Sequence, residues 1–186
     1  MKRLAVVAVL VLAMALFYRS FGGAETGTGN LTLAAPEPNI GSSVRTFTAR
    51  DTKGGTFKLT DNGIYVLTFW STMNRNSNQA RPQFIDLARE YGDDASFAVV
   101  YVNGALEDKD APYDRLHDPN GTLASRYNVK RVPRTFVIRD GEVSLVLDEF
   151  TLADYGEDFG KFLRQGIEDN MEEQTKEDSQ TAFKDN

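Results

Sequence analysis

The sequence predicts an α/β fold, in which one mixed sheet carries helices on both faces and follows an N-terminal β-hairpin. Two runs of apolar, β-branched and aromatic residues, 64–70 and 97–102, are typical of strands buried on both faces. Between them, apolar side chains recur at helical spacing over 84–91. This alternation of strand, helix and strand favours a layered α/β architecture.

The first half of the domain is expected to begin with the hairpin. Its strands are residues 47–50 and 56–59, which flank the turn sequence Lys53-Gly54-Gly55. The helix that follows strand 64–70 is expected to stop at Gly92.

The second half is expected to hold a short helix over 122–127 and an antiparallel pair of strands. The pair comprises 135–138 and 143–147, joined by the turn Asp140-Gly141. A final helix is indicated by apolar residues at Leu152, Tyr155, Phe159, Leu163 and, less regularly, Ile167.

Composition excludes several classes of function. The chain has 186 residues and no cysteine, which excludes disulfides, thiolate zinc sites, iron–sulfur clusters and thiol chemistry. Its net charge of −6 argues against nucleic acid as a partner, because a phosphate-binding face needs clustered Lys and Arg. The single histidine, His117, has no further ligand at coordination spacing, so no metal is expected. The sequence holds no Gly-rich phosphate loop or nucleotide fingerprint, so no cofactor is expected.

The N-terminal segment 1–24 predicts export. Lys2 and Arg3 precede an apolar run over 4–18, which is shorter than the roughly 20 residues that span a bilayer. The segment is therefore a cleaved signal peptide or an uncleaved anchor, and it is the only expected membrane contact. The chain would be periplasmic or on the cell surface, with residues 25–36 as a flexible linker.

The C-terminal segment 168–186 is acidic. It holds seven acidic and two basic residues and so carries −5 of the net charge. With few apolar groups, it is expected to be a fraying helix end followed by disorder. The folded domain is expected to cover 37–167.

The end of strand 64–70 carries the most informative motif. Its residues are Phe69-Trp70-Ser71-Thr72-Met73-Asn74-Arg75-Asn76-Ser77, with Pro82 five residues later, and Arg131-Val132-Pro133-Arg134-Thr135-Phe136 opens a later strand. Over roughly 37–165 this resembles the exported TlpA/ResA-like thiol-disulfide oxidoreductases, whose pattern is F-W-A-T-W-C-x-x-C and later G-V-P-T-T-F. The resemblance implies a thioredoxin-like three-layer α/β/α sandwich with a cis peptide bond before Pro133.

The residues that perform redox chemistry in that family are replaced here. Asn74 and Ser77 occupy the two cysteine positions, Ala80 replaces a glutamate, and Thr68 stands where thioredoxins bury an aspartate. Disulfide exchange needs a thiolate that both attacks and leaves. An amide and a hydroxyl cannot do this, so we expect no catalytic residue at these degenerate positions.

Three interpretations remain for residues 74–78. Asn76, with Gln79 three residues later, fits a helix N-cap and capping box. Alternatively, the helix N-terminus could bind an anion or a carboxylate. A nucleophilic Ser77 would need a base, and His117 has no visible acid partner.

A peptide-binding groove is a further candidate, because in the family the residue before the cis-proline presents its backbone to an extended peptide. Val132 holds that place, and nearby basic residues, including Lys130, would favour an acidic partner, unless they are only solvated surface charges. The candidate groove comprises Trp70, Met73, Arg75, Asn76, Arg131, Val132, Pro133 and Arg134.

The sequence therefore predicts an extracytoplasmic, redox-inactive module that binds a protein or an extended peptide. One alternative is an accessory role in a thiol-disulfide oxidoreductase or cytochrome-maturation system. The other is a membrane-tethered structural or chaperone-like subunit of an envelope complex.

Overall fold

The computed structural model describes residues 38–104, 110–148 and 158–184. The predicted export segment, the linker and two apolar positions of the final helix, Leu152 and Tyr155, lie outside these ranges. No helix within the ranges is long and apolar enough to cross a membrane.

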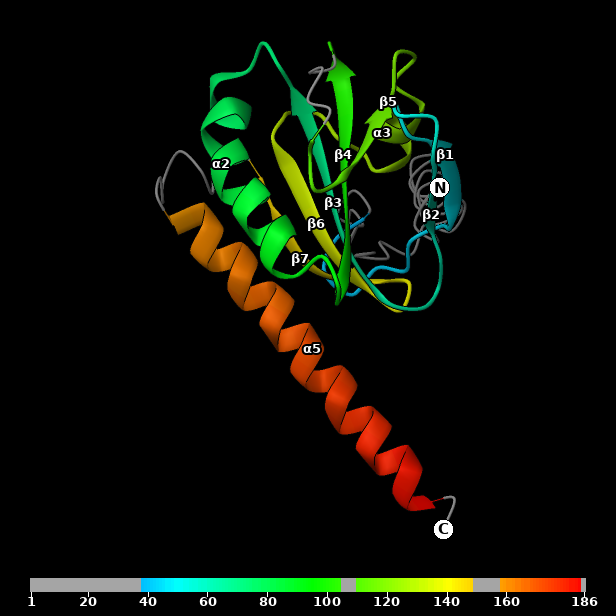
Figure 1. Cartoon of the computed structure of the whole chain (residues 1–186). Coiled ribbons are helices and arrows are strands. Elements are labelled where there is room, and N and C mark those ends of the chain that lie inside the picture. Colours follow the sequence, from blue (N-terminus) through cyan, green and yellow to red (C-terminus); the bar gives the residue numbers. More distant parts are fainter. Residues whose placement is uncertain (1–37, 105–109, 149–157, 185–186) are drawn as a thin grey trace, which may run out of the picture. The chain divides into compact units, whose positions relative to one another are not determined.

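The centre of the fold is a five-stranded mixed sheet in the order β5-β4-β3-β6-β7 (Figure 1). Strands β3, β4 and β5 are parallel, whereas β6 runs antiparallel to both β3 and β7. The strands are β3 (Ile64–Ser71), β4 (Ala95–Asn103), β5 (Asp114–His117), β6 (Arg134–Arg139) and β7 (Glu142–Leu147). The predicted mixed sheet is confirmed.

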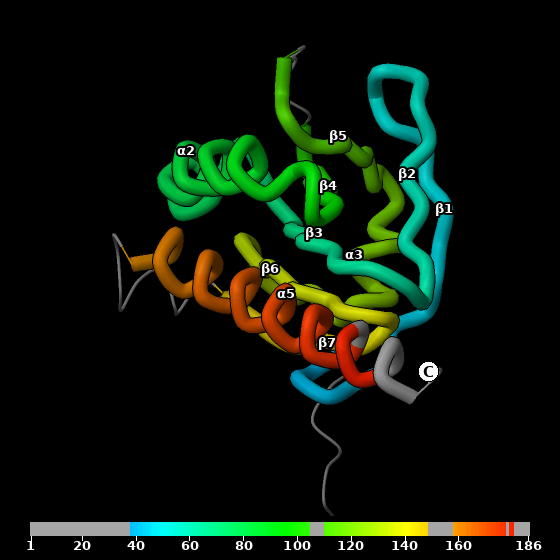
Figure 2. The backbone as a smooth tube through the Cα atoms, turned by 60° about the horizontal axis from the view of Figure 1, so that its bottom comes forward, coloured from blue at the N-terminus to red at the C-terminus, as the bar shows by residue number. Residues whose placement is uncertain are grey.

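Helices and a hairpin cover the two faces of this sheet, which confirms the three-layer sandwich. Helices α2 (Arg75–Glu90) and α5 (Phe159–Lys184) lie on one face, and α3 (Thr122–Arg126) lies on the other (Figure 2). The antiparallel hairpin of β1 (Phe47–Arg50) and β2 (Thr56–Leu59) joins α3 on its face.

Strand β3 supplies side chains to both cores because all eight of its residues are buried. Val66 and Trp70 pack with Phe84 of α2 on one side. Leu67 and Phe69 pack on the other side. This continuous burial explains why the strand reads as an uninterrupted apolar run.

Strand β5 was not predicted from the sequence, which indicated no element between the strand expected over 97–102 and the helix expected over 122–127. This segment pairs in parallel with β4 at the edge of the sheet. The buried Asp51 fastens it, since its Oδ1 accepts a hydrogen bond of 2.7 Å from the backbone N–H of Arg115. A four-residue strand with two charged residues has no apolar periodicity to signal it.

The predicted disorder of segment 168–186 is corrected for residues 168–184, because α5 continues to Lys184. Side-chain contacts with the sheet hold the added turns. Arg139 of β6 places its Nη1 2.6 Å from Glu173 Oε2 and its Nη2 3.6 Å from Glu177 Oε1. The side chain of the buried Asn170 donates a hydrogen bond of 2.9 Å to Ser144 Oγ. The acids that suggested disorder are thus partly neutralised by a basic residue on a different element.

Candidate functional site

The candidate site lies where β3 ends and α2 begins, in the position that the sequence motif indicated (Figure 1). The register of the sheet pairs Phe69 of β3 with Arg134 of β6. Val132 and Pro133 immediately precede Arg134 and therefore lie beside the connection from β3 to α2. The peptide bond between these two residues is cis, as expected.

Asn74, at the first cysteine position, is the N-cap of α2. Its backbone is extended, with φ −96° and ψ 126°, and its side-chain Oδ1 accepts a hydrogen bond of 3.0 Å from the backbone N–H of Ser77. The prediction that Asn76 caps the helix is wrong, because Asn76 lies inside the first turn. An amide therefore satisfies a first-turn N–H, the kind of donor that would stabilise a thiolate in a redox-active relative.

Ser77, at the second cysteine position, is a buried structural residue. It is only 2% exposed, and its Oγ accepts a long hydrogen bond of 3.5 Å from the backbone N–H of Ser71. His117 lies on β5, two strands from β3, and cannot act as its base. The geometry therefore gives no support to a serine nucleophile.

The two positions that handle protons in the family hold uncharged groups. Thr68 is fully buried, and its Oγ1 lies 2.7 Å from the Oγ1 of Thr135 on β6. Ala80 is fully buried on α2. Neither side chain titrates, so these positions contribute packing and one hydroxyl–hydroxyl hydrogen bond.

Trp70 does not line a groove, which corrects its inclusion in the candidate set. Its side chain is 2% exposed and packs edge-on against Phe84, with 5.0 Å between the ring centroids. The alternation of side chains along β3 directs it into the core beneath α2. Its Nε1 is buried without a hydrogen-bond partner in the described part of the chain.

Three of the other candidate residues lie together at the start of α2. Met73 is 86% exposed, Arg75 is exposed and Asn76 is half-buried. Met73 thus presents an apolar side chain to solvent directly before the cap.

The remaining candidates lie on the segment that leads into β6. Arg131 is exposed, Val132 is half-buried and Pro133 is buried. The guanidinium carbon of Arg134 lies 5.3 Å from the ring centroid of Phe136, so this arginine stacks on an aromatic ring. The segment has both a basic and an apolar character.

Two buried tyrosines near Trp70 were not identified from the sequence. Tyr113 contacts the Trp70 ring edge-on, and its Oη lies 3.5 Å from the Oη of Tyr101 on β4. Burial raises the pKa of Tyr101 well above its ordinary range. Tyr101 lies within the apolar run 97–102, where a tyrosine cannot be distinguished from any other core aromatic residue, whereas Tyr113 lies in a polar segment between Pro112 and Asp114.

Sequence comparisons relate the chain to known proteins. The sequence profile of the AhpC/TSA family matches residues 40–146. A "Thioredoxin-like protein" of Haemophilus influenzae is 26% identical over 122 residues, which cover 61% of this chain and 73% of that protein.

Solved structures share the fold. A putative thiol:disulfide interchange protein DsbE from Chlorobium tepidum matches with a TM-score of 0.59 and 24% identity, over 70% of this chain and 96% of that one. The peroxidoxin BcpB from Mycobacterium tuberculosis matches with a TM-score of 0.53 and 26% identity, over 64% and 94% of the two chains. The exposed lipoprotein thioredoxin Etrx1 of Streptococcus pneumoniae strain TIGR4 matches with a TM-score of 0.54 and 20% identity, over 67% and 99%. The chain therefore belongs to the AhpC/TSA family and is a cysteine-less member with the thioredoxin-like fold of the TlpA-like oxidoreductases.

Proposed function

We propose that this chain is a redox-inactive binding domain that holds an extended peptide at the start of α2. The observation that carries the proposal is the side chain of Asn74, which caps the helix at the position of the attacking thiol. Ser77, Thr68 and Ala80 are buried and uncharged at the other redox positions. Four neutral, well-packed replacements suit a stable scaffold better than a catalyst.

The backbone of Val132 supports peptide binding. In the described part of the chain, neither its N–H nor its carbonyl has a hydrogen-bond partner, and β6 begins only at Arg134. Unpaired backbone groups beside a sheet can pair with an added extended strand. The neighbouring Met73 offers an apolar contact for one side chain of such a peptide.

The charges near this backbone favour an acidic peptide. Arg75 and Arg131 are both exposed, on the two segments that flank the end of β3. Exposed arginines add to association rate and selectivity more than to affinity. We therefore expect binding that weakens as ionic strength rises.

Export of the chain is part of the same proposal. The apolar run over 4–18 behind Lys2 and Arg3 supports it. A fold relative is described as an exposed lipoprotein thioredoxin, which fits the same location. The partner would then be an extracytoplasmic protein.

Site-specific cross-linking tests the binding site. A photoreactive residue at position 132, in the full chain in its native envelope, should capture one reproducible partner. The control places the same residue at Lys58, which is exposed on β2. Equal capture from both positions, or none from position 132, would contradict the proposal, and capture of a cysteine-bearing oxidoreductase would favour the accessory role.

Insulin reduction with dithiothreitol tests the redox part separately. The full chain should not raise the rate above that of the reductant alone, because it supplies no thiol. Measurable turnover would overturn the chemical argument without affecting the cross-linking result.

A further inference from the structure

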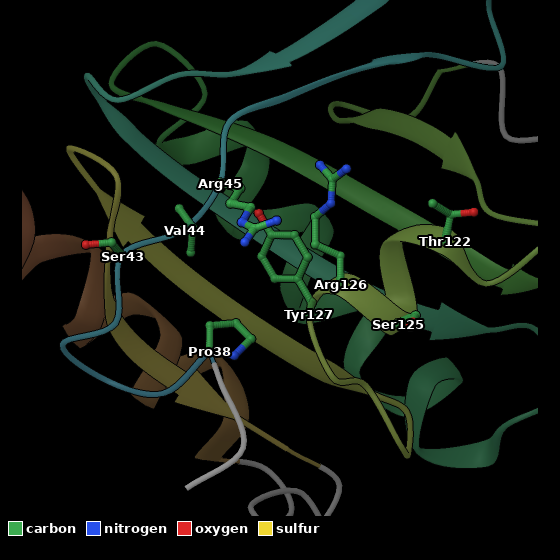
Figure 3. Close-up of a pocket in the computed structure, with 8 residues that line it drawn as sticks. All are labelled: Pro38, Ser43, Val44, Arg45, Thr122, Ser125, Arg126 and Tyr127. Atoms are coloured by element: carbon green, nitrogen blue, oxygen red, sulfur yellow. The ribbon is translucent and has the colours of Figure 1, made fainter. Parts of the chain in front are cut away.

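A polar pocket of about 400 Å³ lies between residues 38–45 and α3 (Figure 3). Its lining residues are distant in sequence from the cap of α2. It belongs to the face of the sheet that carries the hairpin, since its floor residue Tyr127 packs in the core of that face. None of the candidate groove residues lines it. Peptide binding at the start of α2 therefore does not account for this pocket.

Both walls of the pocket are anchored. The segment before β1 is fastened to the β6–β7 turn, where the N–H of Val44 donates to the carbonyl of Gly141 at 2.7 Å. The N–H of Gly41 donates to the carbonyl of Val143 at 2.8 Å. On the other wall, the buried Asp118 accepts a hydrogen bond of 2.8 Å from the N–H of Ala124 in α3. The lining side chains thus project from fixed backbone.

The phenol of Tyr127 is a hydrogen-bond donor without an acceptor. Its side chain is 2% exposed, with its ring centroid 5.5 Å from that of Phe69 and 5.4 Å from that of Phe136. Its Oη is buried and has no hydrogen-bond partner among the described residues. Native proteins rarely leave a buried hydroxyl unpaired, so an acceptor from outside the chain would complete this site.

Two arginines bring positive charge to the same place. Figure 3 shows the side chains of Arg45 and Arg126 beside the ring of Tyr127. Within 38–104, 110–148 and 158–184, neither guanidinium has an ion pair or a hydrogen bond. Two unneutralised guanidinium groups in a chain of net charge −6 favour an anion at this pocket.

We propose that this pocket binds a small organic anion with a phosphate or carboxylate head. The head would accept hydrogen bonds from Arg45, Arg126 and the Tyr127 hydroxyl, and Ser43 and Ser125 also line the pocket. Pro38 and Val44 line the same pocket and provide apolar contact for the body of the molecule. Burial keeps the phenol protonated because it raises the pKa of Tyr127, so the hydroxyl acts as a donor.

Titration of the full chain with simple probes tests this proposal. The probes are phenyl phosphate, inorganic phosphate and benzoate, at constant ionic strength maintained with chloride and followed by calorimetry or NMR. We expect saturable binding of at least one aromatic anion, with amide shifts at Ser125, Arg126 and Tyr127. Tighter binding of phenyl phosphate than of inorganic phosphate would support contact with the apolar wall.

Matched variants locate the site. Arg45→Gln or Arg126→Gln should weaken binding about tenfold, the loss expected for one charge-assisted hydrogen bond. Arg50→Gln, an exposed arginine on β1, should leave it unchanged. Tyr127→Phe should weaken binding severalfold and should still fold, because it removes a hydroxyl that has no partner in the chain.

Three results would overturn the proposal. One is that none of the three probes binds saturably. Another is that Arg50→Gln weakens probe binding as much as Arg45→Gln or Arg126→Gln does. The third is binding to phosphatidylglycerol vesicles that depends on Arg45 and Arg126 while phenyl phosphate does not bind. None of these results bears on the cross-linking test at position 132.

Discussion

Removal of the Asn74 side chain should weaken the fold at the start of α2. In Asn74→Ala, the backbone N–H of Ser77 loses the acceptor that now lies 3.0 Å away. Loss of a helix N-cap costs about 1 kcal/mol of unfolding free energy. The folding equilibrium constant should therefore fall about fivefold, and Tm by roughly 2–4 °C for a domain of this size.

Urea denaturation followed by fluorescence measures this effect directly, because Trp70 is the only tryptophan and is buried. Asn76→Ala is the matched control. It lies inside the helix, where alanine has the higher propensity, so stability should be unchanged or slightly greater. Asn74→Ser should keep most of the cap. If Asn76→Ala were the more destabilising change, the assignment of the cap to Asn74 would be refuted.

Three further predictions concern other parts of the molecule. The double variant Asn74→Cys/Ser77→Cys should form an intramolecular disulfide, detected as a loss of about 2 Da by mass spectrometry, yet reduce insulin slowly because the proton-handling groups are missing. Hydrogen bonding from Arg164 lowers the pKa of Glu90 below its ordinary value of 4.5. This pair therefore adds stability above that pH and loses it as the pH falls through the lowered pKa, so Arg164→Gln and wild type should converge in acid melts. Arg139→Gln should cost less than about 1 kcal/mol but speed amide exchange in the last turns of α5, measured by hydrogen-exchange mass spectrometry.

The strands and helices that the sequence predicted well are those with a strong local pattern. The run 64–70 corresponds to β3 and the run 97–102 lies within β4. The hairpin follows from its glycine-containing turn. In each case the consecutive or alternating apolar residues along the sequence indicate which side chains are buried.

The errors arose where a distant residue decides the outcome. Strand β5 depends on the carboxylate of Asp51, which precedes it by more than 60 positions along the chain. The continuation of α5 depends on Arg139 of β6, which pairs with two of its glutamates. Neither partner can be inferred from the local composition of β5 or α5.

The candidate site divides in the same way. Its location at the end of β3 and the replacement of both thiols are visible in the sequence. The identity of the cap is not, because the sequence pattern pointed to Asn76, whereas the extended backbone of Asn74 and its hydrogen bond from Ser77 appear only in the folded chain. The burial of Trp70 likewise depends on which face of β3 meets α2.

The sequence by itself determined that this chain performs no thiol chemistry, because no fold can supply a sulfur atom that the residues lack. It also determined the fold, since the order and spacing of the motifs survive the loss of the cysteines. Only the tertiary structure decided which groups of the described residues are left without partners, among them the backbone of Val132 and the hydroxyl of Tyr127. Pairing depends on contacts between segments far apart in the chain, so it is a property of the packed molecule.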